Sequence, residues 1–250
     1  MKEFYIGYLP SAPPAIRRRV GILVGLIVLF GVASGALFAV AQSGFAKSYF
    51  EFGKPREFTG VLRRHPFPTL VADDTIREGS SSPSVYLLVA PGKFGADSLV
   101  GGKDDWHVRL RGTRIHRTEG EMIEIEPGSI VETPDSRTSA SLERDLGYAR
   151  LSGEIVDTKC YLGVMNPGEG KVHRECAALC LRGGIPPALV SSDLDGKPRL
   201  FILIGPEGEP MAKEDYLQRV GQPVSMEGRI VEKDQLYYLQ ADPASIVALP

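Results

Sequence analysis

The longest hydrophobic segment of the chain lies near its N-terminus, at residues 20–41. It contains no charged residue and no proline. At about 1.5 Å per residue, a helix of this length spans roughly 33 Å, enough to cross a bilayer core of about 30 Å. Three arginines at residues 17–19 precede it, and the next basic residue is Lys47. By the positive-inside rule we expect residues 1–19 in the cytoplasm and residues 42–250 on the far side.

A cleaved signal peptide is the alternative interpretation of this segment. Residues 39–41 read Ala-Val-Ala, which is an acceptable cleavage site. The apolar run is longer than the usual signal core of about 7–15 residues, which favours an uncleaved anchor. In a bacterium this places a single-pass protein in the inner (plasma) membrane, with its C-terminal part in the oxidising periplasm.

The remainder of the chain has the pattern of β-strands. Short runs of Val, Ile, Leu, Tyr and Phe alternate with Gly, Pro, Asp and Ser, after a linker at residues 42–55. Helical spacing recurs only near residues 171–182 and 211–219. The soluble part is therefore expected to be mainly β.

The strand-rich part contains an internal repeat. Three pairs of segments match in the same order along the chain: 58–62 with 151–155, 86–91 with 201–206, and 108–131 with 224–247. A repeat of this kind predicts two copies of one structural unit. We expect a first domain at residues 56–132, a linker at residues 133–149 and a second domain at residues 150–250.

Each copy holds about five short strands and opens with a strand that contains a glycine, Gly60 or Gly153. Glycine inside a strand is typical of a bulge or sharp bend, which small barrels need at their corners. The pattern favours two tandem small β-barrels that resemble the OB-fold. A small β-sandwich would fit the same strands.

The copies differ in one insert, residues 157–187, which contains all three cysteines of the chain. A helix over residues 171–182, stopped by two glycines, would place His173, Cys176 and Cys180 on one face. Cys160 would approach that face from the preceding loop. We therefore expect a Cys/His loop-helix on the second barrel.

The residue types in this insert allow three interpretations. The first is a metal site of Cys160, His173, Cys176 and Cys180, with Met165 as a further candidate ligand, for Zn, Cu or an Fe–S cluster. The second is a disulfide between Cys160 and either Cys176 or Cys180, which leaves one thiol over. The third is a redox-active thiol pair, Cys176 with Cys180.

The insert also carries a family resemblance. Residues 153–187 read GEIVDTKCYLGVMNPGEGKVHRECAALCLRGGIPP. This stretch resembles a segment of uncharacterised membrane-anchored bacterial proteins. The resemblance implies that the insert is one functional unit, and it implies no catalytic role.

The net charge and the absence of known motifs exclude several classes of function. The formal net charge is −2, so there is no electrostatic reason to expect nucleic-acid binding. The chain lacks the motifs of a nucleophile elbow, a phosphate-binding loop, a dinucleotide fold, a zinc protease or a c-type haem. These absences favour a role other than catalysis.

The sequence therefore predicts a membrane-anchored periplasmic protein that binds a metal or assists redox chemistry. Its expected partners are the lipid bilayer and a membrane complex of respiratory type. The alternatives are a structural or assembly subunit with disulfide-stapled β-domains, and a thiol oxidoreductase.

Overall fold

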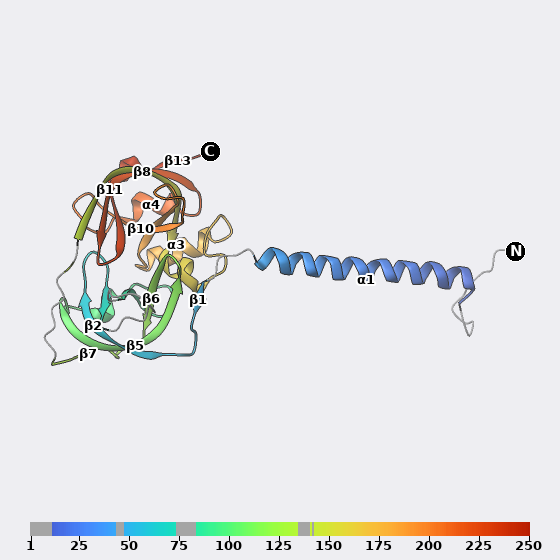
Figure 1. Ribbon diagram of the computed structural model, residues 1–250, viewed down its shortest axis with the longest axis horizontal. Coiled ribbons are helices and arrows are strands. Elements are labelled where there is room, and N and C mark those ends of the chain that lie inside the picture. Colours follow the sequence, from blue (N-terminus) through green and yellow to red (C-terminus); the bar gives the residue numbers. More distant parts are fainter. Residues whose placement is uncertain (1–11, 44–47, 74–83, 135–140, 142) are drawn as a thin grey trace. The chain divides into compact units, whose positions relative to one another are not determined.

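The computed structural model describes residues 12–43, 48–73, 84–134, 141 and 143–250 (Figure 1). The chain divides into two compact units, Met1–Ala46 and Lys47–Pro250. The described part of the first unit is helical, and every strand among the described residues lies in the second unit.

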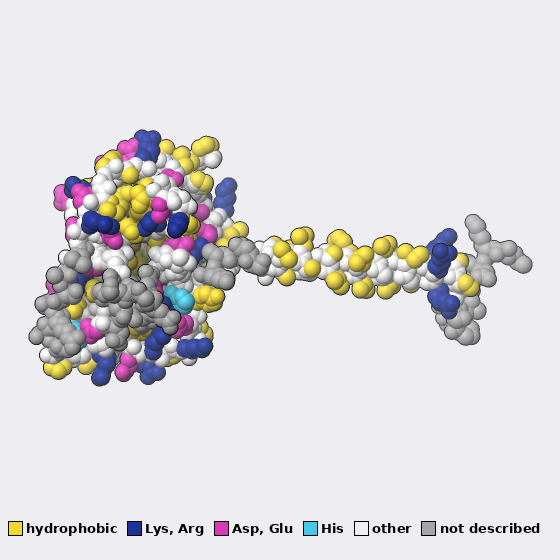
Figure 2. Space-filling view, in the orientation of Figure 1, with side chains coloured by type: hydrophobic (Ala, Val, Ile, Leu, Met, Phe, Trp, Pro, Cys, Tyr) yellow, Lys and Arg dark blue, Asp and Glu magenta, His cyan; other side chains and the backbone are white. Residues whose placement is uncertain are grey.

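The first unit contains helix α1, Pro14–Ser43. Pro14 occupies its first position, where proline needs no hydrogen-bond partner for its backbone nitrogen. Hydrophobic side chains cover α1 all round, and basic side chains gather at its N-terminal end (Figure 2). By length and composition it is the one described helix able to cross a membrane, with a mean hydropathy of 2.5. A membrane anchor and a signal sequence share these properties.

The second unit contains two closed five-stranded barrels. The strands of the first barrel are β2 Arg56–Arg63, β3 Thr69–Ala72, β4 Val85–Val89, β5 Trp106–Arg117 and β6 Gly120–Ile125. They pair in the order β2-β3-β4-β6-β5, and β5 closes the ring on β2. Four of the pairings are antiparallel, and β4–β6 is parallel.

The second barrel repeats this arrangement strand for strand. Its strands are β8 Glu143–Asp157, β9 Pro187–Ser191, β10 Arg199–Ile204, β11 Pro223–Lys233 and β12 Leu236–Ala241. They pair in the order β8-β9-β10-β12-β11, β11 closes on β8, and the β10–β12 pairing is the parallel one. The prediction of two small barrels is confirmed, and the β-sandwich alternative is wrong.

Equivalent glycines mark the tight places in both barrels. A Cβ atom on Gly60 would lie 2.2 Å from the carbonyl oxygen of Val71, and one on Gly153 would lie 2.0 Å from that of Val190. Neither approach leaves room for a side chain. The glycine in the opening strand of each copy is therefore needed where the neighbouring strand crosses closely.

Several short elements complete the unit. They are β1 Tyr49–Phe50, α2 Asp97–Val100, β7 Val131–Glu132, π-helical turn η1 Cys160–Val164, α3 Arg174–Arg182, α4 Lys213–Tyr216, 3₁₀ turns η2 Leu217–Arg219 and η3 Pro243–Ser245, and β13 Val247–Ala248. α3, α4 and η2 lie where the sequence predicts helix.

Strand pairing extends into both expected linkers. β1 falls within residues 42–55 and pairs with the end of β5, Tyr49 opposite His116. β8 begins at Glu143, inside residues 133–149, and its first half pairs with the long strand β11. The side chains of this half are exposed, so they carry no hydrophobic alternation that the sequence could reveal.

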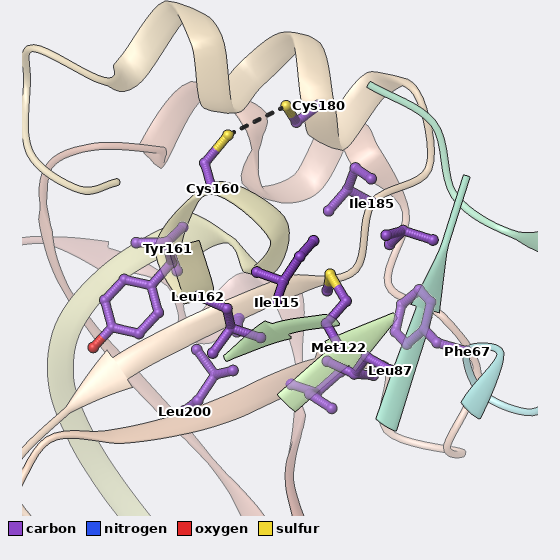
Figure 3. Close-up of a cluster of buried hydrophobic side chains, with 14 of the residues drawn as sticks. Phe67, Leu87, Ile115, Met122, Cys160, Tyr161, Leu162, Cys180, Ile185 and Leu200 are labelled. Atoms are coloured by element: carbon purple, nitrogen blue, oxygen red, sulfur yellow. Dashed lines mark hydrogen bonds between the residues drawn. The ribbon is translucent and has the colours of Figure 1, made fainter. Parts of the chain in front are cut away.

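The two barrels share a hydrophobic core. One buried cluster combines Leu87, Ile115 and Met122 of the first barrel with Leu162 and Leu200 of the second (Figure 3). Burial of these apolar surfaces holds the barrels together. The insert between β8 and β9 contributes to this interface through η1 and α3.

Candidate metal centre

The insert is the connection between the first two strands of the second barrel, residues 158–186. The corresponding connection in the first barrel is residues 64–68. Helix α3 has Glu175 in its first turn and Arg182 in its last, which suits the helix dipole. It ends at Gly183 and Gly184, as glycine commonly ends helices. Its buried residues are Ala177, Ala178, Cys180 and Leu181.

The three cysteines come together where the start of η1 meets α3. Their sulfur atoms all lie within 4.8 Å of one another. Cys160 lies at the start of η1, and its sulfur is 3.9 Å from that of Cys180 (Figure 3). Cys160 and Cys180 are buried and Cys176 is half-buried; all three are free thiols. The cluster therefore has two inner sulfurs and one that reaches the surface.

His173 is held in a neighbouring pair. Its Nε2 lies 3.0 Å from Oδ2 of Asp157, and both side chains are buried. The other carboxylate oxygen of Asp157 accepts a hydrogen bond from the backbone N–H of Cys160, at 2.8 Å. Asp157, His173 and Cys160 also present ligand atoms within 4.8 Å of one another. Asp157 thus positions both Cys160 and His173.

A lysine from the first barrel completes the cluster. Lys93 follows β4, and its Nζ lies 2.8 Å from the sulfur of Cys176 and 3.7 Å from that of Cys180. The sequence analysis missed this residue, which lies more than eighty positions away. Nothing in the local pattern around Lys93 marks it. Only the docking of the two barrels brings it to the thiols.

The loop that carries Lys93 is fixed to the insert at both of its ends. The buried Lys159 donates hydrogen bonds from Nζ to the carbonyl oxygens of Ala90, at 2.8 Å, and Gly92, at 2.7 Å. It also pairs with Glu124, at 2.6 Å. At the other end, the N–H of Gly95 donates to the carbonyl of Gly183, at 3.0 Å.

A close approach at Gly183 fits the loop against α3. A Cβ atom on Gly183 would lie 1.7 Å from the carbonyl oxygen of Lys93. The glycine that ends the helix thus also admits the Lys93 loop. Any larger residue there would push Lys93 away from the thiols.

These contacts shift the pKa values of two of the thiols in opposite directions. The hydrogen bond from the Cys160 thiol lowers the pKa of Cys180, and the Lys93 ammonium lowers it further, against the effect of burial. The same hydrogen bond and burial raise the pKa of Cys160. The hydrogen bond to Cys176 raises the pKa of Lys93. The arrangement favours a thiolate at Cys180 beside a lysine that keeps its charge.

The structure brings together part of the ligand set expected from the sequence. The three cysteines form one group. His173 reaches Cys160 and Asp157, and it is not a member of the three-sulfur group. Met165 follows η1 with 44% of its side chain exposed. Of the two expected disulfide pairings, Cys160–Cys180 is the one whose sulfurs are in direct contact.

The histidines of the first barrel lie apart from this cluster. The ring of His107 contacts Asp73 and Thr133, and that of His116 stacks on Tyr49. Both rings therefore make contacts within the second unit that lie away from the thiols.

Comparisons with family models, with curated proteins and with solved structures gave no match to the chain.

Proposed function

We propose that this protein is a membrane-anchored metal-binding protein of the bacterial cell envelope, with one soft metal ion bound by Cys160, Cys176 and Cys180. The observation that carries the proposal is the convergence of the three sulfurs within 4.8 Å. Thiolates are the ligands preferred by Cu(I), Zn and iron–sulfur clusters.

The spacing of the sulfurs supports a single ion. With a metal–sulfur bond of about 2.3 Å, two sulfurs on one ion lie about 3.8–4.0 Å apart. The sulfurs of Cys160 and Cys180 lie 3.9 Å apart. In a [4Fe–4S] cluster each cysteine binds a different iron atom, and a [2Fe–2S] cluster needs two ligands on each of two iron atoms, so three sulfurs gathered around one point fit neither arrangement. The group therefore suits one ion better than a cluster.

The surroundings support a prepared site. Asp157 holds the backbone of Cys160, and Lys93 neutralises part of the charge that three thiolates would carry. His173, paired with Asp157, lies beside Cys160. We propose that it supports the Cys160 ligand through Asp157.

We place the site outside the cytoplasm. The support is the apolar helix α1 and the three arginines at residues 17–19 that precede the hydrophobic run. We propose an uncleaved anchor in the inner (plasma) membrane, with residues 42–250 in the periplasm near a membrane complex of respiratory type. The parallel pairing of the third and fifth strands supports assigning both barrels to the OB type.

The test is metal analysis of the full-length protein, purified in detergent under anaerobic, reducing conditions. The expected result is one soft metal ion per chain, lost when Cys160, Cys176 or Cys180 is replaced by serine. An Asp157→Asn variant should bind the ion about 10–100-fold more weakly. A protein that binds no soft metal, or that retains it in all three serine variants, would refute the proposal.

A second candidate function is thiol–disulfide exchange. It is favoured by the half-buried Cys176, whose sulfur lies 2.8 Å from the Lys93 ammonium. A half-buried thiol is accessible to a disulfide substrate, as reactive cysteines are. Alkylation rates of the folded, reduced, metal-free protein test this function. If Cys176 reacts no faster than a free cysteine peptide, this second function is excluded.

A third arrangement, a purely structural subunit, requires a stable disulfide. It predicts that the protein isolated from cells without reductant carries Cys160 bridged to Cys180 or Cys176. Peptide mass analysis after alkylation distinguishes it from the metal-binding protein, whose three cysteines would all be alkylated after metal removal.

A further inference from the structure

The donor set of the site is one ligand short of a zinc site. Structural Zn²⁺ is almost always bound by four ligands. Among the described His, Cys, Asp and Glu side chains, only Cys160, Cys176 and Cys180 form the three-sulfur group, and no fourth joins it within 4.8 Å. The nearby nitrogen of His173 is engaged by Asp157. Three thiolates form a complete ligand set for Cu(I), which accepts a trigonal arrangement of soft donors.

The position of Lys93 disfavours Zn²⁺ more than Cu⁺. Its Nζ approaches two of the three sulfurs, Cys176 and Cys180, at 2.8 and 3.7 Å. An ammonium group has three donors and no lone pair, so it cannot serve as a ligand. It also repels any cation that the sulfurs bind. Because the repulsion is proportional to the charge of the ion, Zn²⁺ is penalised about twice as much as Cu⁺.

The loop that carries Lys93 is held against the insert by hydrogen bonds. Lys159 binds the carbonyl groups of Ala90 and Gly92, and Gly95 is bonded to Gly183 on the other side of Lys93. The backbone of the loop therefore cannot withdraw without breaking buried hydrogen bonds. The loop therefore keeps Lys93 within reach of the thiols.

We propose that the site selects Cu(I) over Zn²⁺, because it offers three thiolates as its ligand set and places the Lys93 ammonium beside two of them. This inference rests on the proposed metal-binding function. It adds the identity of the ion and assigns Lys93 as the residue that determines the selectivity.

The decisive measurement is the ratio of the Cu(I) and Zn²⁺ affinities in the full-length protein. Each affinity is measured by competition with a coloured chelator, under anaerobic conditions and in detergent. Removal of the ammonium in Lys93→Leu also lets protons compete better for the thiolates. Both ions displace the same protons, so this effect cancels in the ratio, and the ratio isolates the repulsion of the bound ion.

The expected result is that Lys93→Leu lowers the preference for Cu(I) by at least about tenfold, and that Lys93→Glu lowers it further. Lys197→Leu is the matched control, because Lys197 is exposed in the turn between β9 and β10. Its ratio should equal that of the unchanged protein. The circular dichroism spectra of all variants show whether the barrels remain folded.

X-ray absorption of the copper-loaded protein provides the second measurement. We expect three sulfur ligands and no nitrogen ligand around copper. A nitrogen from His173, or a fourth sulfur from Met165, would overturn the inference. A ratio in Lys93→Leu equal to that of the control would also overturn it. Both results leave the metal-binding function intact, whereas a protein that binds neither ion refutes the proposed function itself.

Discussion

Replacement of Lys159 by methionine should both destabilise the protein and loosen the metal site. Only 2% of the Lys159 side chain is exposed, although it ends in a polar group. It is satisfied by Glu124 and by the carbonyl groups of Ala90 and Gly92, all within 2.8 Å. Methionine fills a similar volume and satisfies none of the three.

The magnitude follows from what the substitution leaves behind. Loss of one partner of a buried ion pair typically costs about 3–5 kcal/mol, because the other charge remains buried. The Glu124 side chain is 19% exposed, so water can hydrate it in part. Two carbonyl groups also lose a charged donor, although each has a second lone pair and carbonyls tolerate this better than N–H groups. We therefore expect a loss near the lower end of the range, about 3 kcal/mol of unfolding free energy.

Urea unfolding of the full-length protein in detergent, followed by circular dichroism, measures this loss. Lys171→Met is the control, since Lys171 is exposed in the same insert, and it should change the unfolding free energy by less than about 0.5 kcal/mol. The double variant Lys159→Met with Glu124→Leu should recover part of the loss. A cost below about 1 kcal/mol for Lys159→Met, or no recovery in the double variant, would refute the reasoning.

Three further predictions concern the insert. Burial raises the pKa of Glu154 above the ordinary glutamate pKa of 4.5. Ionisation of this carboxyl group therefore opposes folding once the pH rises above 4.5. Glu154→Gln keeps an acceptor for the N–H of Gly170. This variant should be more stable than the unchanged protein by less than about 1 kcal/mol at pH 7, and equally stable at pH 3. Urea unfolding that shows the same effect at both pH values would contradict this. Leu162→Ala should cost about 2–5 kcal/mol of unfolding free energy, because Leu162 is fully buried between the barrels; a cost below 1 kcal/mol would show that this contact does not hold them. Mild oxidation of the metal-free protein should form a disulfide between Cys160 and Cys180, whose sulfurs touch. Bound metal should prevent this disulfide. Peptide mass analysis that finds another pairing would contradict the prediction.

The architecture was largely accessible from the sequence because its signals are local and repeated. The apolar run at residues 20–41 became helix α1, and the three matched segments became equivalent strands of two barrels. The glycines at 60 and 153, where the sequence predicted a bulge or sharp bend, lie where a neighbouring strand crosses closely. The limits of the strands were less accessible. β8 begins well before its buried part, since pairing with β11 is decided by backbone hydrogen bonds and leaves no hydrophobic pattern.

The candidate site was accessible only in part. The cysteines and His173 stood out because their residue types are chemically distinctive and because they share one insert. Helical spacing alone placed His173 with Cys176 and Cys180. In the fold, His173 precedes α3 and its ring pairs with Asp157. An aspartate at the end of a strand has no signal of its own.

The sequence by itself therefore determined the apolar helix, the two barrels and the segment that carries the thiols, because periodicity, repetition and residue type are properties of neighbouring positions. The tertiary structure alone decided which groups surround the thiols. Lys93 reaches Cys176 because the barrels pack through a common hydrophobic core, and Lys159 fixes its loop from the other side of that interface. Contacts of this kind join positions far apart in the chain, and they exist only once both barrels have folded against each other.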